Sequence, residues 1–147
     1  MYKHILIPTD GSKLSEKAIQ AGIEFASFIH ARVTGFTAVP EYQAPSEVEF
    51  ISKQAVSLDA YENIAKKQAE IALQPIAERA RAAGVDYDAE FAQSDHPHEA
   101  IVRAALTHGC DLIFMASHGR HGISSLMHPS ETQAVLTHSA IPTLVYR

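Results

Sequence analysis

Two polar segments, each directly after a short apolar run, hold the residue types in this 147-residue chain that could do chemistry. The first, residues 9–12, has the sequence TDGS and follows the apolar run at residues 5–8. An aspartate at this place can accept hydrogen bonds from a sugar or an amine, or hold a cation. The simpler interpretation is that Asp10 and Ser12 cap the helix that follows, because both residue types are common helix caps.

The second segment, residues 117–130, is rich in glycine, serine and histidine and leads into an expected helix. Backbone N–H groups at the start of a helix favour an anion, and phosphate above all. The segment is neither a Walker loop nor a Rossmann fingerprint, because neither GxxxxGK[ST] nor GxGxxG occurs in the chain. Composition alone is therefore weak evidence for a phosphate site.

Short apolar runs alternate with longer segments of helical periodicity. Strands are expected at residues 3–8, 32–39, 85–92, 111–116 and 142–146. Helices are expected at residues 12–31, 60–83, 97–108 and 130–138, with a loop and one helical turn at 41–59. This alternation predicts a single α/β domain over residues 1–147, with one parallel sheet covered by helices on both faces.

Three residues should shape the ends and the course of these helices. Pro75 is expected to kink or split the second helix, because proline removes a backbone donor. Gly84 should then end that helix as a left-handed cap. Ser130 has Gln133 three residues later, which predicts a capping box at the start of the last helix.

Charge and cysteine content exclude several classes of protein. Twelve Lys and Arg against seventeen Asp and Glu give a net charge of −5, the wrong sign for a general nucleic-acid binder. The single cysteine, Cys110, excludes an internal disulfide framework and is expected to be a buried packing residue. No stretch approaches the roughly 18 apolar residues of a membrane span, and the opening residues do not resemble a signal peptide. We therefore expect a cytoplasmic protein that binds neither nucleic acid nor membranes.

Three segments resemble the universal stress protein family. The sequence ILIPTDGS at residues 5–12 resembles its first strand and turn, and DLIFMASHGR at 111–120 resembles its fourth strand and the start of its phosphate loop. Residues 130–147 resemble its last helix and last strand, so the resemblance spans essentially the whole chain. It implies an adenine-nucleotide-alpha-hydrolase-like fold with strand order 3-2-1-4-5, which places both polar segments at the switch point of the sheet. It also implies a homodimer paired through the last strand, Pro142 to Tyr146.

The same resemblance implies a site for ATP or another adenine nucleotide, with Mg²⁺. Asp10 would contact the ribose or the metal, and the backbone of Ala38 would meet the adenine. Gly119, Ser130 and Thr132 would face the phosphates. The full set of nucleotide-binding residues that the resemblance implies is Thr9, Asp10, Ala38, Met115, Ala116, His118, Gly119, Pro129, Ser130 and Thr132.

This chain departs from the pattern of the nucleotide-binding members, which carry GxxG, nine residues, and then G[ST] in this loop. Ala116 and Pro129 replace two of these glycines, and Pro129 has no N–H to donate and cannot take a positive φ. Glu131 also places a carboxylate beside the phosphate position, where it could itself occupy the helix N-terminus. One lost charge-assisted hydrogen bond is worth about 1.5–3 kcal/mol, which predicts a degraded site with roughly tenfold to hundredfold weaker binding.

The sequence therefore predicts a regulatory or protective universal-stress-type protein with a degraded adenine-nucleotide site. Two alternatives remain open. One is a member that binds no nucleotide and acts through dimerisation and protein contacts. The other is metal binding by His118, His121 and His128, although no cysteine or carboxylate completes an obvious ligand set. No GxSxG elbow surrounds the loop serines, so nothing marks a dedicated catalyst, and slow ATP hydrolysis is the most that is expected.

Overall fold

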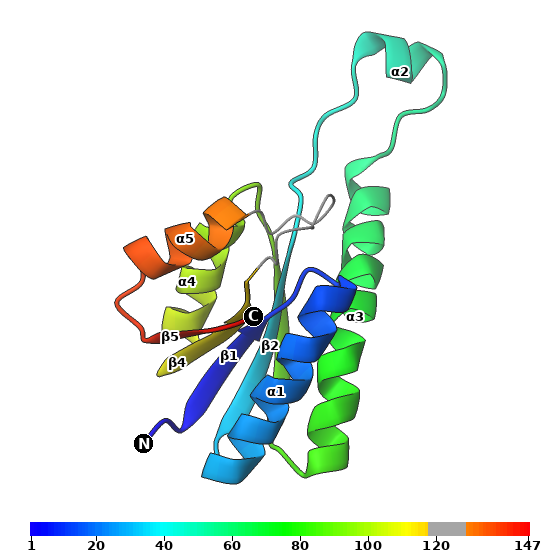
Figure 1. The fold of residues 1–147 in the computed structure, drawn as a ribbon. Coiled ribbons are helices and arrows are strands. Elements are labelled where there is room, and N and C mark those ends of the chain that lie inside the picture. The colour runs from blue at the N-terminus through cyan, green and yellow to red at the C-terminus, as the bar shows by residue number, and fades with distance from the viewer. Residues whose placement is uncertain (118–128) are drawn as a thin grey trace.

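A computed structural model of the chain describes residues 1–117 and 129–147. The first half forms β1 (His4–Pro8), α1 (Lys13–Ile29), β2 (Arg32–Val39), α2 (Glu47–Ile51) and α3 (Leu58–Ala83). The second half forms β3 (Tyr87–Gln93), α4 (Pro97–Thr107), β4 (Leu112–Ala116), α5 (Pro129–His138) and β5 (Thr143–Tyr146). The strands make one parallel five-stranded sheet in the order β3-β2-β1-β4-β5 (Figure 1). The expected α/β architecture and strand order are confirmed.

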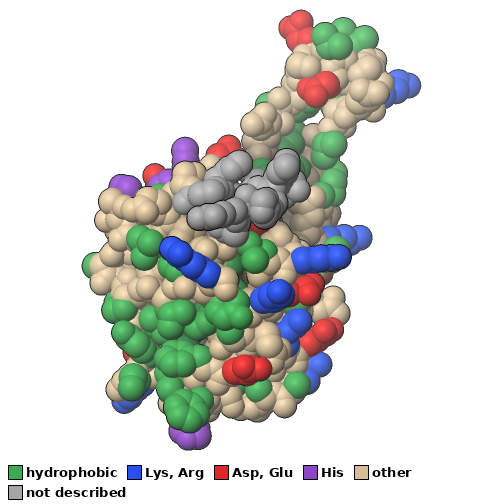
Figure 2. Space-filling model, viewed as in Figure 1, with side chains coloured by type: hydrophobic (Ala, Val, Ile, Leu, Met, Phe, Trp, Pro, Cys, Tyr) green, Lys and Arg blue, Asp and Glu red, His purple; other side chains and the backbone are tan. Residues whose placement is uncertain are grey.

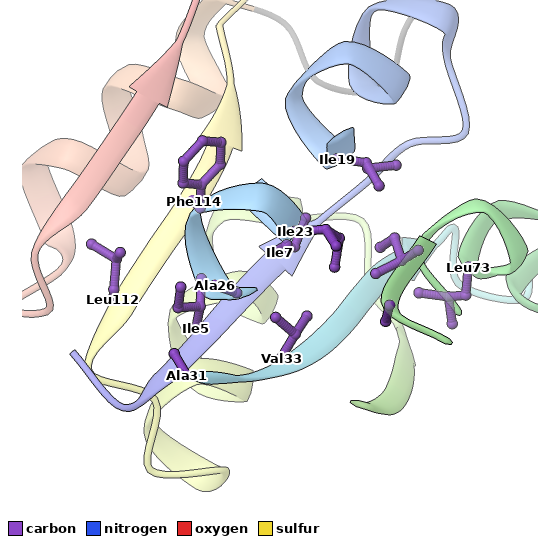
Figure 3. Close-up of a cluster of buried hydrophobic side chains, with 12 residues drawn as sticks. Ile5, Ile7, Ile19, Ile23, Ala26, Ala31, Val33, Leu73, Leu112 and Phe114 are labelled. Carbon is purple, nitrogen blue, oxygen red and sulfur yellow. The ribbon is translucent and has the colours of Figure 1, made fainter. Parts of the chain in front are cut away.

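Helices cover both faces of the sheet because the central strands are apolar on both sides. β1 and β4 are buried along their whole length. Ile5 and Ile7 point into the cluster under α1 and α3 (Figure 3), whereas Leu6, between them, points into the cluster under α4 and α5. Successive side chains of a strand alternate between its faces, so an unbroken apolar run requires cover on each side.

α3 runs through Pro75 as one helix of 26 residues, so the predicted split is wrong. Leu73 and Ile76, on either side of the proline, are both buried. That burial outweighs the one backbone hydrogen bond that proline removes, because tertiary packing supplies most of a helix's stability. Gly84 ends the helix in the left-handed conformation (φ +67°), as predicted. Within the described residues, none of the helices combines the length and the apolar character needed to cross a membrane.

α5 begins one residue earlier than expected, at Pro129. Ser130 therefore lies within the first turn rather than at the N-cap, and the predicted capping box is wrong. Proline is favoured at the first helical position because its fixed φ suits the helix and its missing N–H would be unpaired there. The side-chain amide of Gln133 instead donates to Thr137 Oγ1 at 3.4 Å.

His4 is a polar side chain buried on β1, with its ring Nε2 2.8 Å from Thr34 Oγ1. Burial, with the positive charge of Arg32 nearby, lowers the pKa of His4 below its usual value. Below about pH 6.5 the unfolded chain therefore binds a proton at this ring that the folded protein resists, and acid destabilises the fold. We expect the free energy of unfolding to fall between about pH 7 and about pH 5, and to fall less in His4→Gln. Urea denaturation at each pH measures this, and an equally steep fall in the variant would contradict it.

Candidate functional site

The carboxyl ends of β1 and β4 lie side by side, because the two strands pair in parallel through Ile5 with Leu112 and Leu6 with Ile113. The chain winds toward β2 and β3 on one side and toward β5 on the other, so this is the switch point of the sheet. Ligands of open α/β sheets bind outside the strand ends at such a point. The turn after β1 and the end of β4, both predicted from the sequence to matter, do meet here.

Hydrogen bonds to its neighbours fix the turn after β1. Thr9 is buried, its N–H donates to the Phe36 carbonyl at 2.8 Å, and its own carbonyl accepts from Thr37 Oγ1 at 2.8 Å. Thr9 Oγ1 accepts from the Gly11 N–H at 3.1 Å. Gly11 has φ +78°, a conformation that glycine adopts readily, and this turns the chain toward α1.

Asp10 is held at the N-terminus of α1. Its Oδ1 accepts from the Ser12 N–H at 2.9 Å and from the Ser15 hydroxyl at 2.7 Å. Ser12 is the N-cap, and its Oγ accepts from the Ser15 N–H at 3.3 Å. The capping interpretation is confirmed for Ser12, whereas Asp10 bonds to Ser12 and Ser15 and supports that cap. This role is compatible with a ligand contact, because a carboxylate whose position is fixed by its neighbours is what a preorganised site requires.

On the β4 side, most of the predicted residues have buried side chains. Met115 and Ala116 are buried, and the Met115 side chain packs in the core under α4 and α5. Thr132 in α5 is also buried, and its hydroxyl donates to the Ala116 carbonyl at 3.5 Å, which ties α5 to the end of β4. Ser130 is exposed in the first turn of α5.

Of the remaining predicted site residues, one lies in the described part of the chain and the others lie outside it. Ala38 is half-buried near the end of β2, the strand next to β1. His118 and Gly119, like the metal candidates His121 and His128, lie outside the described residues. Within residues 1–117 and 129–147, no group of three His, Cys, Asp or Glu side chains is arranged to hold a metal ion.

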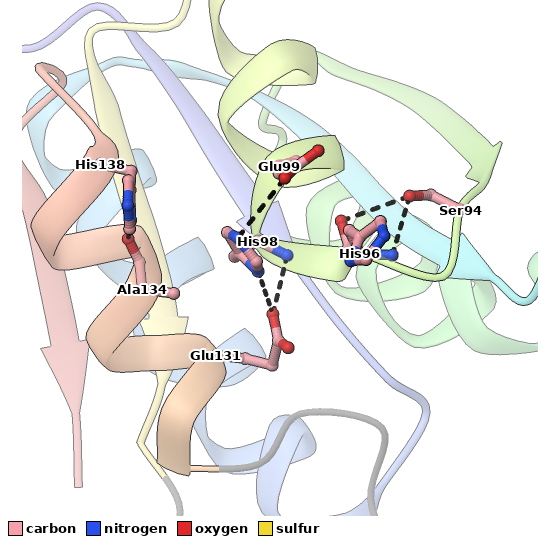
Figure 4. Close-up of polar contacts among 7 residues, drawn as sticks. All are labelled: Ser94, His96, His98, Glu99, Glu131, Ala134 and His138. Carbon is pink, nitrogen blue, oxygen red and sulfur yellow. Dashed lines mark hydrogen bonds and ion pairs between the residues drawn. The ribbon is translucent and has the colours of Figure 1, made fainter.

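Glu131 does not occupy the N-terminus of its own helix, contrary to the expectation. Its Oε2 accepts from the backbone N–H of His98 and from the ring Nδ1 of His98, both at 2.9 Å (Figure 4). In the part of the chain that the structure describes, the α4 N-cap residue His96 makes no side-chain capping hydrogen bond. Glu131 therefore caps α4 from α5. The sequence carries no local signal for this contact, because its partners are 33 residues apart.

Replacing Glu131 by alanine should lower the free energy of unfolding by about 1–2 kcal/mol, because the start of α4 loses its cap and its charged acceptor. Glu131→Gln keeps an acceptor and should lose less. Glu99→Ala is the matched control, since Glu99 is exposed and lies 3.9 Å from the His98 ring. Urea denaturation of the three variants measures the difference. A loss in Glu131→Ala no larger than in Glu99→Ala would show that Glu131 does not cap α4.

Cys110 is a buried member of the core under α4 and α5, as predicted. Burial, with the negative charge of Asp111 beside it, raises the pKa of its thiol to about 12. A thiol that stays protonated at neutral pH is a poor nucleophile, so Cys110 has a packing role.

The chain is a doubly wound α/β protein with an acidic turn at the switch point of its sheet, and in proteins of this class ligands bind outside the strand ends at such a point. The sequence model described as "Universal stress protein family" matches residues 1–147. The chain belongs to that family, and the resemblance seen in its sequence is confirmed.

Individual relatives of known sequence or structure match this chain over nearly its full length. The universal stress protein YxiE of Bacillus subtilis (strain 168) is 27% identical over 151 residues, covering 100% of both chains. The solved structure of MJ0577, a universal stress protein of Methanocaldococcus jannaschii, superposes with a TM-score of 0.74 at 26% identity, covering 99% of this chain and 95% of that one.

Two further solved structures carry adenine nucleotides. A universal stress protein in complex with cAMP superposes with a TM-score of 0.68 at 23% identity, covering 99% of this chain and 97% of that one. The universal stress protein from Archaeoglobus fulgidus in complex with dAMP has a TM-score of 0.67 at 16% identity, covering 99% and 98%. At these identities the superpositions show the shared fold.

Proposed function

We propose that this chain is a regulatory or protective universal stress protein that binds an adenine nucleotide, such as ATP with Mg²⁺, at the switch point between β1 and β4. The observation that carries the proposal is the Asp10 turn, in which Ser12 and Ser15 hold the carboxylate at the ends of two adjacent strands. Members of the family with the same fold carry cAMP and dAMP, which supports an adenine nucleotide as the ligand class.

In this proposal Asp10 contacts the ribose or the Mg²⁺, and the backbone of Ala38 contacts the adenine. The start of α5 supplies donors to the phosphates. Because α5 begins at Pro129, the N–H groups of Ser130 and Glu131 are first-turn donors not used within the helix, and Pro129 contributes none. The carboxylate of Glu131 accepts from His98, so it does not cap these donors and leaves α5's own N-terminus to an anion.

Calorimetric titration with ATP and Mg²⁺, on protein freed of co-purified nucleotide, tests the proposal. We expect a saturable heat and a rise in the melting temperature, with AMP and cAMP as comparison ligands. Neither heat nor thermal stabilisation at millimolar ATP would overturn nucleotide binding. That result would favour the alternative in which the protein acts through protein contacts alone.

Replacing Pro129 by glycine should tighten ATP binding by roughly tenfold, because it restores a backbone N–H and the freedom to take positive φ. The matched control is Pro45→Gly, which removes a proline from the distant segment between β2 and α2. Calorimetry on both variants measures the change. Unchanged affinity in Pro129→Gly would mean that the missing donor does not limit the site.

We further propose that the protein forms a homodimer through β5. β5 is an edge of the sheet, and its sequence TLVY carries no charge, whereas the opposite edge strand β3 carries Asp88 and Glu90. Charged side chains on an edge strand oppose pairing with another strand, so β5 is the better template. Figure 2 shows hydrophobic side chains gathered on the side of the molecule where β5 lies. Sedimentation equilibrium at low protein concentration should give twice the monomer mass, and a monomer at all concentrations would contradict the dimer.

A further inference from the structure

Residues 40–57 form an arm that projects from the end of the sheet and carries α2 at its tip (Figure 1). The expectation for this part of the chain was a loop with one helical turn, and α2 is that helix. All of α2 is exposed, and its three large apolar side chains are 75% (Val48), 70% (Phe50) and 83% (Ile51) exposed. Apolar side chains gathered on a projecting element mark an interaction site.

Specific hydrogen bonds give the arm its shape. Ser46 and Glu49 form a capping box, in which Ser46 Oγ accepts from the Glu49 N–H at 3.3 Å and Glu49 Oε2 accepts from the Ser46 N–H at 2.7 Å. Toward the base, the Tyr42 hydroxyl donates to the Val56 carbonyl at 2.8 Å and ties the two limbs together. The Tyr42 ring also packs on Tyr61 of α3, with centroids 5.4 Å apart. A tip that is preorganised in this way loses less entropy on binding.

The charge of the arm limits which surfaces can bind its exposed apolar side chains. Residues 40–57 contain Glu41, Glu47 and Glu49 against one basic residue, Lys53, so the arm is net acidic. Figure 2 shows acidic, basic and hydrophobic side chains together at the tip. Like charges disfavour a second arm or an anionic membrane as the partner. The complementary surface is an apolar groove with a basic side chain at its edge.

The chain presents such a groove between α4 and α5. It has a volume of about 400 Å³ and is lined by His98, Glu99, Val102, Arg103, Leu106 and His138. Val102 and Leu106, four residues apart on α4, form its apolar floor, and Leu106 is 64% exposed. Arg103 and Glu99 both line the groove, and the His98 and His138 rings approach each other there with centroids 5.8 Å apart (Figure 4).

We propose that the arm of one copy docks into the α4–α5 groove of a second copy. The apolar side chains of α2 cover Val102 and Leu106, in the way that short helices bind hydrophobic grooves. Glu47 then lies beside Arg103, which pairs an acidic side chain of the tip with the basic side chain of the groove. The groove is separate from the β5 edge, so this contact joins β5-paired dimers into larger assemblies and does not depend on nucleotide.

Charge reversal tests the pairing. Sedimentation velocity of the full chain should show a concentration-dependent species heavier than the dimer. Glu47→Lys and Arg103→Glu should each remove that species, and the two changes combined in one chain should restore it. Glu62→Lys, the same change at an exposed position on α3, should have no effect. Wild-type protein that never exceeds the dimer, or a double variant that stays dissociated, would overturn the proposal.

Disulfide trapping identifies the occupied surface. A tagged Ile51→Cys chain is mixed with an untagged Leu106→Cys chain under mild oxidation, and we expect a crosslink that contains both. Ala83→Cys is the control acceptor, because Ala83 lines a second, more polar hollow at the opposite end of the sheet. Cys110 is buried, so it does not compete. A crosslink to Ala83→Cys in place of Leu106→Cys, or none at all, would show that the arm does not occupy the α4–α5 groove.

Discussion

Replacing Asp10 by alanine is expected to weaken ATP binding by roughly tenfold to a hundredfold. The variant loses a charge-assisted contact to the ribose or the metal, worth about 1.5–3 kcal/mol. It also leaves the Ser12 N–H and the Ser15 hydroxyl without the acceptor that now orders the turn. Calorimetric titration of the wild type and the variant, with folding checked by circular dichroism, measures the loss.

Two further variants separate the ligand contact from the structure of the turn. Asp10→Asn keeps the shape of the side chain and removes its charge, so a loss there reports the electrostatic contact. Ser15→Ala removes the donor 2.7 Å from Asp10 Oδ1 and keeps the carboxylate, so we expect only a small loss of affinity. A folded Asp10→Ala protein that binds ATP as tightly as the wild type would place the nucleotide elsewhere.

Replacing Phe114 by alanine is expected to lower the free energy of unfolding by about 3–5 kcal/mol. Phe114 is 3% exposed on β4 and packs in the cluster between the sheet and α1 (Figure 3). Its ring lies 6.2 Å from that of Phe25 and 6.4 Å from that of Tyr146, between centroids. The loss is large because the whole stability of a domain is about 5–15 kcal/mol. Urea denaturation measures it.

The controls for Phe114 distinguish burial from general sensitivity. Phe114→Leu keeps most of the apolar volume and should lose about 1 kcal/mol. Phe28→Ala removes an aromatic ring that is 83% exposed at the end of α1, and should change stability by no more than about 0.5 kcal/mol. Equal losses in Phe114→Ala and Phe28→Ala would contradict the placement of Phe114 in the core.

The order of the elements and the ends of several of them follow from local signals. The unbroken apolar run at β4 predicts a strand covered on both faces, and that burial is observed. Ser12 caps the start of α1 through its hydroxyl, and Gly84 ends α3 because a residue without a Cβ adopts positive φ readily. Each of these signals involves residues within one turn or one strand. There, backbone preferences and the hydrophobic period are enough to predict the structure.

Three features could not be predicted in this way. Pro75 is accommodated inside α3, because the helix is held by its packing on the sheet rather than by its own hydrogen bonds alone. Glu131 accepts from the start of α4 and not from its own helix. The fold brings it beside His98, which is 33 residues away in the sequence, so no local pattern predicts the contact. The projecting arm has exposed apolar residues that a helical pattern normally assigns to a core.

The amino-acid pattern alone therefore established the family, the α/β class and the turn at which Asp10 lies. Those properties depend on local preferences and on motifs that are contiguous in the chain. Which carboxylate reaches which helix end, and which apolar face stays uncovered, became visible only in the folded protein. These depend on contacts between elements that are distant in sequence, whose free energies are set by how the whole sheet and its helices pack.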